Sequence, residues 1–153
     1  MITPWPRAWG SSSGSALIRC SPEDFCVSEQ LGFELSGDGE HSFLYLQKRQ
    51  LNSMHLLQRV YELSGSAPRD IGLSGLNDCN AVTRQWFSVG MAGRAEPNWG
   101  SLESEGDVKV LEVSRHLRKL RRGVHRANHF TLVLRELIGD RVALEQRLQT
   151  LRD

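Results

Sequence analysis

Alternation of apolar and polar side chains predicts several short strands along this chain. Residues 42–47 carry Phe43 and Tyr45 at alternate positions with Leu44 and Leu46, which indicates a strand buried on at least one face. Other segments rich in β-favouring residues are bounded by turn formers such as Ser21-Pro22-Glu23-Asp24. These segments are Ala16–Arg19, Phe25–Ser28, Ala81–Val89, Val108–Val113 and Phe130–Leu134.

Two segments have the three- and four-residue periodicity of an amphipathic helix. The first begins at Asn52 or Ser53, both good N-cap residues, and ends at Gly65. The second begins at Asp140 or Arg141 and continues to the end of the chain. Strands and helices follow one another irregularly, without βαβα alternation. The expected fold is therefore α+β, with a mostly antiparallel sheet and flanking helices.

Length and composition indicate one ordinary domain of a soluble globular protein. The chain has 153 residues, of which 39% are apolar and 24% charged. Residues 1–15 are rich in Pro, Trp, Gly and Ser and are expected to form an irregular lead-in to a domain over residues 16–153. The start lacks a basic segment followed by an apolar run, and no stretch approaches the roughly 18 apolar residues of a membrane span. We therefore expect a cytoplasmic protein with no membrane partner.

Three cysteines, Cys20, Cys26 and Cys79, lack Cys-x-x-Cys spacing. Neither a disulfide framework nor a metal site is expected from them, and a reducing cytoplasm suits them best.

Net charge is close to zero, with 19 basic and 18 acidic residues, but the basic residues are unevenly placed. The segment Arg115–Arg126, called here the basic segment, holds six Arg or Lys and two His in twelve residues, and no acid. Such a segment can neutralise RNA phosphates. A solvated basic face, or pairing with acids elsewhere in the chain, is the alternative. The residues expected to contact an RNA backbone are Arg115, Arg118, Lys119, Arg121 and Arg122.

Asn128-His129-Phe130 follows the basic segment after one residue and strengthens the RNA interpretation. An aromatic ring can stack on an unpaired base while an amide reads its edge. Taken alone, Phe130 is better explained by core packing at the start of a strand.

Three blocks of this sequence together resemble the TruD family of tRNA pseudouridine synthases. Ser21–Glu29 (SPEDFCVSE) is similar to the family's PEDFxVxE block, and Gly75–Trp86 (GLNDCNAVTRQW) to its G-x-K-D-x-x-A-x-T-x-Q-W block. The third block runs from Arg115–Leu120 (RHLRKL) through Gly123 to Asn128–Arg135 (NHFTLVLR). The blocks occur in the family's order, and the resemblance extends from about residue 16 to residue 151.

The resemblance implies isomerisation of a uridine in tRNA, typically uridine 13 of the D arm, without a cofactor. It places Asp78 as the nucleophile, with Phe25, Asn128 and Phe130 lining the pocket for the target base, and the basic segment along the tRNA backbone. Without the flanking blocks, Asp78 would be interpreted as an ordinary turn residue.

The chemistry of this reaction needs such groups. The N1–C1′ bond breaks, the uracil rotates, and C5 is joined to C1′; a carboxylate can act as a covalent nucleophile in this sequence. Unstacking the uridine costs roughly a few kcal/mol, and stacking on an aromatic side chain returns about 1–3 kcal/mol. The carboxylate must be ionised, which requires a nearby cation or hydrogen-bond donors.

The sequence departs from the family pattern in three respects. Asn77 stands where the family usually has Lys, so an amide replaces a charge beside Asp78, and Ala127 replaces a Gly. The family also continues into an inserted domain and a C-terminal half that follow the last predicted helix. We therefore expect an unpaired sheet edge that a missing half or self-association would cover. The alternatives are a non-catalytic RNA-binding remnant of such an enzyme and a basic α+β binding module unrelated to it.

Overall fold

The computed structural model describes residues 10–152. Over that range it contains eight strands, two α-helices and three short 3-10 helices, which confirms the predicted α+β class. The strands are β1 (Gly14–Leu17), β2 (Phe25–Leu31), β3 (His41–Arg49), β4 (Ile71–Leu73), β5 (Val82–Gly90), β6 (Val108–His116), β7 (His125–Leu132) and β8 (Arg135–Gly139). The α-helices are α1 (Ser53–Ser64) and α2 (Arg141–Arg152), and the 3-10 helices are Pro22–Asp24, Pro68–Asp70 and Trp99–Glu103. Neither α-helix is long and apolar enough to cross a membrane.

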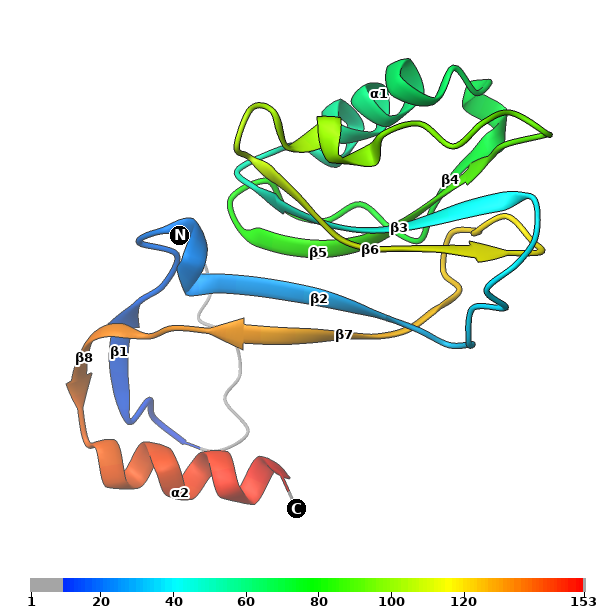
Figure 1. Cartoon of the computed structure of the whole chain (residues 1–153). Coiled ribbons are helices and arrows are strands. Elements are labelled where there is room, and N and C mark those ends of the chain that lie inside the picture. Colours follow the sequence, from blue (N-terminus) through cyan, green and yellow to red (C-terminus); the bar gives the residue numbers. More distant parts are fainter. Residues whose placement is uncertain (1–9, 153) are drawn as a thin grey trace, which may run out of the picture.

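Six strands form one sheet, in the order β6-β3-β5-β2-β7, and β4 pairs with β5 beyond the stretch of β5 that pairs with β2 (Figure 1). Every neighbouring pair is antiparallel except β2 and β5, which run parallel, so the predicted mostly antiparallel sheet is confirmed. The outer strands of this sheet are β6 and β7. A second sheet of two strands pairs β1 with β8 and leads into α2.

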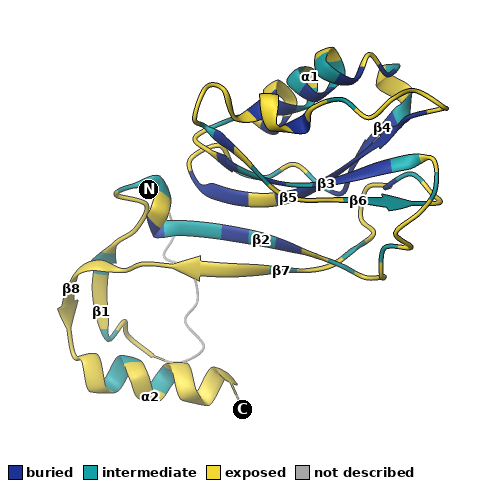
Figure 2. Cartoon of the chain, viewed as in Figure 1, coloured by how far each residue is buried: buried dark blue, intermediate teal, exposed yellow. Residues whose placement is uncertain are grey.

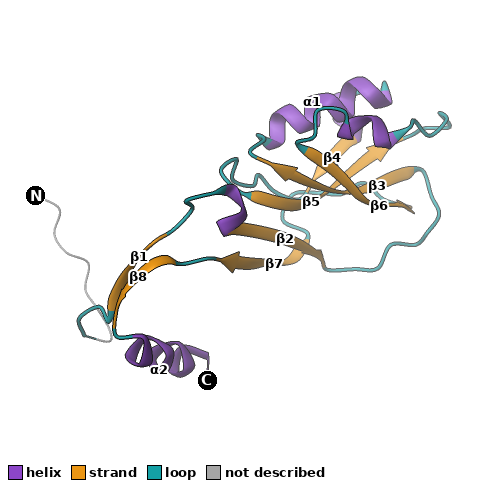
Figure 3. Cartoon of the chain, turned by 60° about the vertical axis from the view of Figure 1, so that its left-hand side comes forward, coloured by secondary structure: helices purple, strands orange, loops and turns teal. Residues whose placement is uncertain are grey.

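Alternate side chains of β3 enter two different apolar clusters, one on each face of the sheet. Leu44 and Leu46 pack with Leu56 and Val60 of α1, which covers one face (Figure 3). Phe43 packs on the other face, in a smaller cluster with Trp86 and Leu120. Figure 2 shows the buried residues gathered around α1, β3, β4 and β5, whereas β7, β8 and α2 are largely exposed.

Both predicted helix starts are confirmed by side-chain caps. The Asn52 side chain accepts a hydrogen bond from the backbone N–H of Met54 (2.8 Å), and Gly65 ends α1 with a left-handed φ of 60°. The Asp140 carboxylate accepts from the backbone N–H of Ala143 (3.0 Å) at the start of α2.

Strand boundaries differ from prediction mainly at the outer strands. The strand expected over Phe130–Leu134 lies at His125–Leu132, and neither β8 nor the short buried strand β4 was predicted. An outer strand is exposed on both faces, so its sequence need not alternate, and the polar start of β7 gave no strand signal. The strand β1 begins at Gly14, inside the segment expected to be an irregular lead-in, whose first nine residues lie outside the described range.

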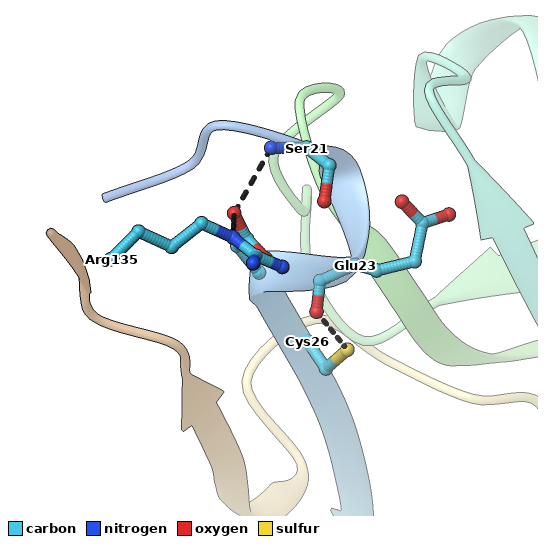
Figure 4. Close-up of polar contacts among 5 residues, drawn as sticks. Ser21, Glu23, Cys26 and Arg135 are labelled. Carbon is cyan, nitrogen blue, oxygen red and sulfur yellow. Dashed lines mark hydrogen bonds and ion pairs between the residues drawn. The ribbon is translucent and has the colours of Figure 1, made fainter. Parts of the chain in front are cut away.

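An ion pair between the buried Asp24, directly before β2, and the half-exposed Arg135, the first residue of β8, ties these two strands together (Figure 4). The Asp24 carboxylate is 1% exposed and accepts two short hydrogen bonds from the Arg135 guanidinium, 2.7 Å from Nη2 and 2.8 Å from Nε. The backbone N–H of Ser21 also donates to it (3.1 Å). The Arg135 hydrogen bonds, supported by Ser21, lower the pKa of Asp24 to about 2.

Candidate active site

Asp78 lies in the loop between β4 and β5, and both of its carboxylate oxygens are bound. The backbone N–H of Asn80 donates to Oδ1 (2.9 Å), and Nη1 of Arg19 donates to Oδ2 (2.8 Å). The Asp78 side chain remains 34% exposed, so the carboxylate is fixed in orientation and still open to solvent. The Asn80 N–H, followed by the Arg19 charge, holds the pKa of Asp78 below its usual value. Asp78 is therefore ionised at neutral pH, as a nucleophilic role requires.

Arg19 provides the cation beside Asp78 that an ionised carboxylate requires and that the neutral Asn77 cannot supply. Its guanidinium carbon lies 4.2 Å from the centre of the Phe25 ring while its Nη1 binds Asp78, so one side chain connects these two residues. Arg19 has a left-handed φ of 56°, an uncommon conformation for a residue other than glycine. The sequence did not predict this role, because Arg19 precedes Asp78 by 59 positions and no local motif joins the two residues.

Lys48, on β3, holds the backbone of the same loop. Its side chain is fully buried, and Nζ donates to the carbonyl oxygens of Leu51 (2.7 Å) and Asp78 (3.0 Å). Burial lowers the pKa of Lys48. The sequence contained a usable signal, because Lys48 continues the series of inward-facing positions that Leu44 and Leu46 begin on β3.

Glu29 forms a second buried support for the loop. Its side chain is 3% exposed, and its carboxyl oxygens accept from the Ser74 hydroxyl, the backbone N–H of Trp86 (3.0 Å) and the Asn77 amide (3.4 Å). The amide that replaces the family's usual Lys therefore donates to Glu29.

Phe25, Asn128 and Phe130 lie on one face of the β2–β7 pair. In the register, Glu29 is opposite Asn128 and Val27 is opposite Phe130, and residues two apart on a strand share a face. The rings of Phe25 and Phe130 are stacked, with centroids 6.0 Å apart and planes 25° from parallel. Phe130 is 59% exposed, so core packing does not explain it.

The structure brings the carboxylate and these aromatic residues together on that face. Arg19 links Asp78 to Phe25, and the Asn77 amide reaches Glu29 opposite Asn128. The Asn128 Oδ1 atom is buried and accepts no hydrogen bond from any described residue, while its Nδ2 lies 3.5 Å from Nε2 of His125.

The basic segment spans the end of β6, the following loop and the start of β7. Arg115 is ion-paired with Glu96, and the Lys119 ammonium donates to the carbonyl of Arg69. The pairing with an acid elsewhere in the chain, raised as an alternative, thus applies to Arg115. The remaining three predicted RNA contacts are exposed and form no ion pair within residues 10–152. They are Arg118, Arg121 and Arg122.

The sequence matches the family model of tRNA pseudouridine synthase D (TruD) over residues 8–153. It is 49% identical over 147 residues to tRNA pseudouridine synthase D of Methylococcus capsulatus, covering 96% of this chain and 41% of that protein. It is 44% identical over 146 residues to the same enzyme of Pseudomonas syringae pv. tomato, covering 95% and 41%. The chain belongs to the TruD family.

A solved structure has the same fold. A putative tRNA pseudouridine synthase D (TruD) from Methanosarcina mazei superimposes with a TM-score of 0.72 at 22% sequence identity, covering 90% of this chain and 31% of that one. The chain spans about 41% of the length of the curated relatives named above.

Proposed function

We propose that residues 16–153 form the first part of a pseudouridine synthase catalytic domain and isomerise uridine to pseudouridine in tRNA. The observation that carries this proposal is the Asp78 carboxylate, held ionised by the Asn80 N–H and Arg19 beside the exposed aromatic pair Phe25 and Phe130. Membership of the TruD family supplies the reaction class. The family resemblance further points to uridine 13 of the D arm as the target.

Asp78 acts as the nucleophile in this proposal. The carboxylate is charged at neutral pH because its pKa is lowered, so no proton has to be removed before it reacts. A covalent intermediate through such a carboxylate divides the cleavage of N1–C1′ and the formation of C5–C1′ into two easier steps. Arg19 stabilises the carboxylate before reaction, and Lys48 and Glu29 fix the loop that carries it.

The target uracil stacks on Phe130, the more open of the two rings. Stacking contributes about 1–3 kcal/mol and offsets much of the cost of unstacking the nucleotide from the tRNA. Asn128 lies on the same face, and its Oδ1 is buried without a partner among the described residues; rotation of the amide toward the base would offer this acceptor to the N3–H of uracil, which cytosine lacks. No cofactor is required by these steps.

The test is chemical mapping of pseudouridine in an unmodified tRNA transcript incubated with the purified 153-residue chain, with Asp78→Asn as the matched control. We expect modification by the parent chain and none by Asp78→Asn, because the amide cannot act as a nucleophile. Equal modification by both chains would exclude Asp78 as the nucleophile. Salt-sensitive tRNA binding without modification would favour the non-catalytic RNA-binding remnant, which the neutral Asn77 beside Asp78 also suggests.

A further inference from the structure

A hollow of about 850 Å³ lies where β2 ends and the basic segment crosses the sheet. It is lined by Gly32, Phe33 and residues 116–121 and 124, and none of these is acidic. Arg118, Lys119 and Arg121 contribute three cations to its wall. The hollow, called here the Phe33 hollow, is therefore positively charged and large enough for a nucleotide, since small-molecule sites are typically about 300–1,000 Å³.

Phe33 gives this hollow a partly exposed aromatic surface that is fixed from behind. Its ring is 36% exposed and stacks against His116, with centroids 5.0 Å apart and planes 29° from parallel. It also contacts the fully buried Phe43 edge-on, with centroids 6.2 Å apart. These contacts hold the ring in place, so a ligand stacking on it would not have to order it first.

The cationic wall is also held in place. Leu120 is 2% exposed, and its backbone N–H donates to the Ser88 hydroxyl (2.9 Å). Gly72 makes this crossing possible, because a Cβ atom there would lie 2.2 Å from the carbonyl oxygen of Leu120. Further along, the backbone N–H of Gly123 donates to the carbonyl of Ser74 (2.9 Å). The basic segment is thus fastened to the sheet in its middle, leaving the Arg118 and Arg121 side chains exposed.

We propose that the Phe33 hollow binds an unpaired nucleotide of the RNA, distinct from the uridine presented to Asp78. The base stacks on Phe33, and Arg118 and Arg121 neutralise the adjacent phosphates. The identity of the RNA as tRNA rests on the proposed function. A flat aromatic surface favours a nucleobase over an acidic peptide, which would need the cations alone.

The two sites take up different parts of the RNA. Phe25 and Leu31 are the two ends of β2, six residues apart, which corresponds to about 20 Å at roughly 3.3 Å per residue. Stacked nucleotides in one strand are about 3.4 Å apart, so several nucleotides separate the two ends. Phe25, at the start of β2, lies next to the reacting base. The Phe33 hollow is an anchoring site at the other end of β2.

The test measures binding of a labelled, unmodified tRNA transcript over a range of salt concentrations. Phe33→Leu keeps an apolar side chain and removes the stacking surface, so we expect affinity to fall about 5- to 150-fold with an unchanged salt slope. Arg118→Gln with Arg121→Gln should reduce the slope of log affinity against log salt by about 1.4–1.8. Phe33→Tyr should retain the affinity. Lys109→Gln, an exposed charge on β6, is the control and should lower the slope less than the double variant.

Wild-type affinity in folded Phe33→Leu would overturn the proposal. Competition by polyglutamate as strong as by a single-stranded oligonucleotide would also overturn it, in favour of an acidic protein partner. Pseudouridine mapping on the same samples separates this inference from the proposed function. Modification by the parent chain with unaltered Phe33→Leu binding refutes only the hollow, whereas weakened Phe33→Leu binding without any modification refutes only the catalytic proposal.

Discussion

Replacing Glu29 tests whether the loop that carries Asp78 depends on a buried acceptor. Glu29→Ala removes the partner of two donors, the Ser74 hydroxyl and the buried Trp86 N–H, and also that of the Asn77 amide. Each buried donor left without an acceptor costs about 1–3 kcal/mol, so the two buried donors together predict a loss of about 2–6 kcal/mol in the free energy of unfolding. That is a large part of the roughly 5–15 kcal/mol typical of a domain.

Urea and thermal unfolding followed by circular dichroism measure this loss. At about 2–4 °C per kcal/mol for a chain of this size, we expect the melting temperature to fall by roughly 4–24 °C. The matched control is Glu112→Ala, an exposed residue on β6, which should change the unfolding free energy by about 0.5 kcal/mol or less. A free energy of unfolding of Glu29→Ala within about 1 kcal/mol of that of the parent chain would refute the reasoning, because this difference is no more than the net contribution of one hydrogen bond.

Glu29→Gln separates loop placement from overall stability. The amide oxygen can still accept from the Trp86 N–H and the Ser74 hydroxyl, but its nitrogen meets the donating amide of Asn77. We expect smaller destabilisation than in Glu29→Ala and a lower rate of pseudouridine formation at saturating tRNA. An unchanged rate in this variant would show that Asn77 does not need Glu29 to place Asp78.

Three further outcomes follow from charges around the site. Arg19→Gln removes the cation beside Asp78, so the carboxyl titration midpoint of Asp78, followed by NMR, should rise toward its ordinary value. The second outcome concerns Asp24, whose pKa is lowered to about 2 in the folded chain. Its pairing with Arg135 therefore stabilises the fold fully at pH values above 3.8, the ordinary pKa of the group. The deficit of Asp24→Asn in urea unfolding should thus be full above about pH 4 and disappear near pH 2. Lys48→Met leaves two carbonyls without a donor and should reduce pseudouridine formation while tRNA affinity is retained.

Each of these outcomes has a contrary result. An unchanged midpoint in Arg19→Gln would show that Arg19 does not lower the pKa of Asp78 and would leave the Asn80 N–H as its main cause. A constant deficit for Asp24→Asn from pH 2 to pH 7 would mean that the carboxylate charge contributes nothing. Equal activity of Lys48→Met and the parent would show that the loop needs no support from β3.

The inner strands and both helix starts could be predicted because their causes are local. Alternation on β3 and the caps Asn52 and Asp140 are properties of a few neighbouring residues. The polar starts of the outer strand β7 and the unpredicted β8 carry no such signal, because strands exposed on both faces can have almost any sequence.

The residues of the candidate site likewise fall into those that local motifs predict and those that only the fold brings to the site. Asp78, Phe25, Asn128 and Phe130 could be named because short motifs carry them, and their roles stay predictions. Arg19 reaches Asp78 only through the fold, and no local pattern identifies a partner so distant in the chain.

Because the end of the basic segment and two residues of the base pocket lie on the one strand β7, the number of residues between them is restricted. Arg126 ends the basic segment, and Phe130 follows four residues later on the same strand, about 13 Å away at 3.3 Å per residue. Removing Ala127 would turn Asn128 and Phe130 to the opposite face of the sheet, away from Asp78, because side chains alternate along a strand. Substitutions in this stretch can therefore accumulate where insertions and deletions cannot, and the interval between the basic segment and Asn128 should be constant in length among active relatives.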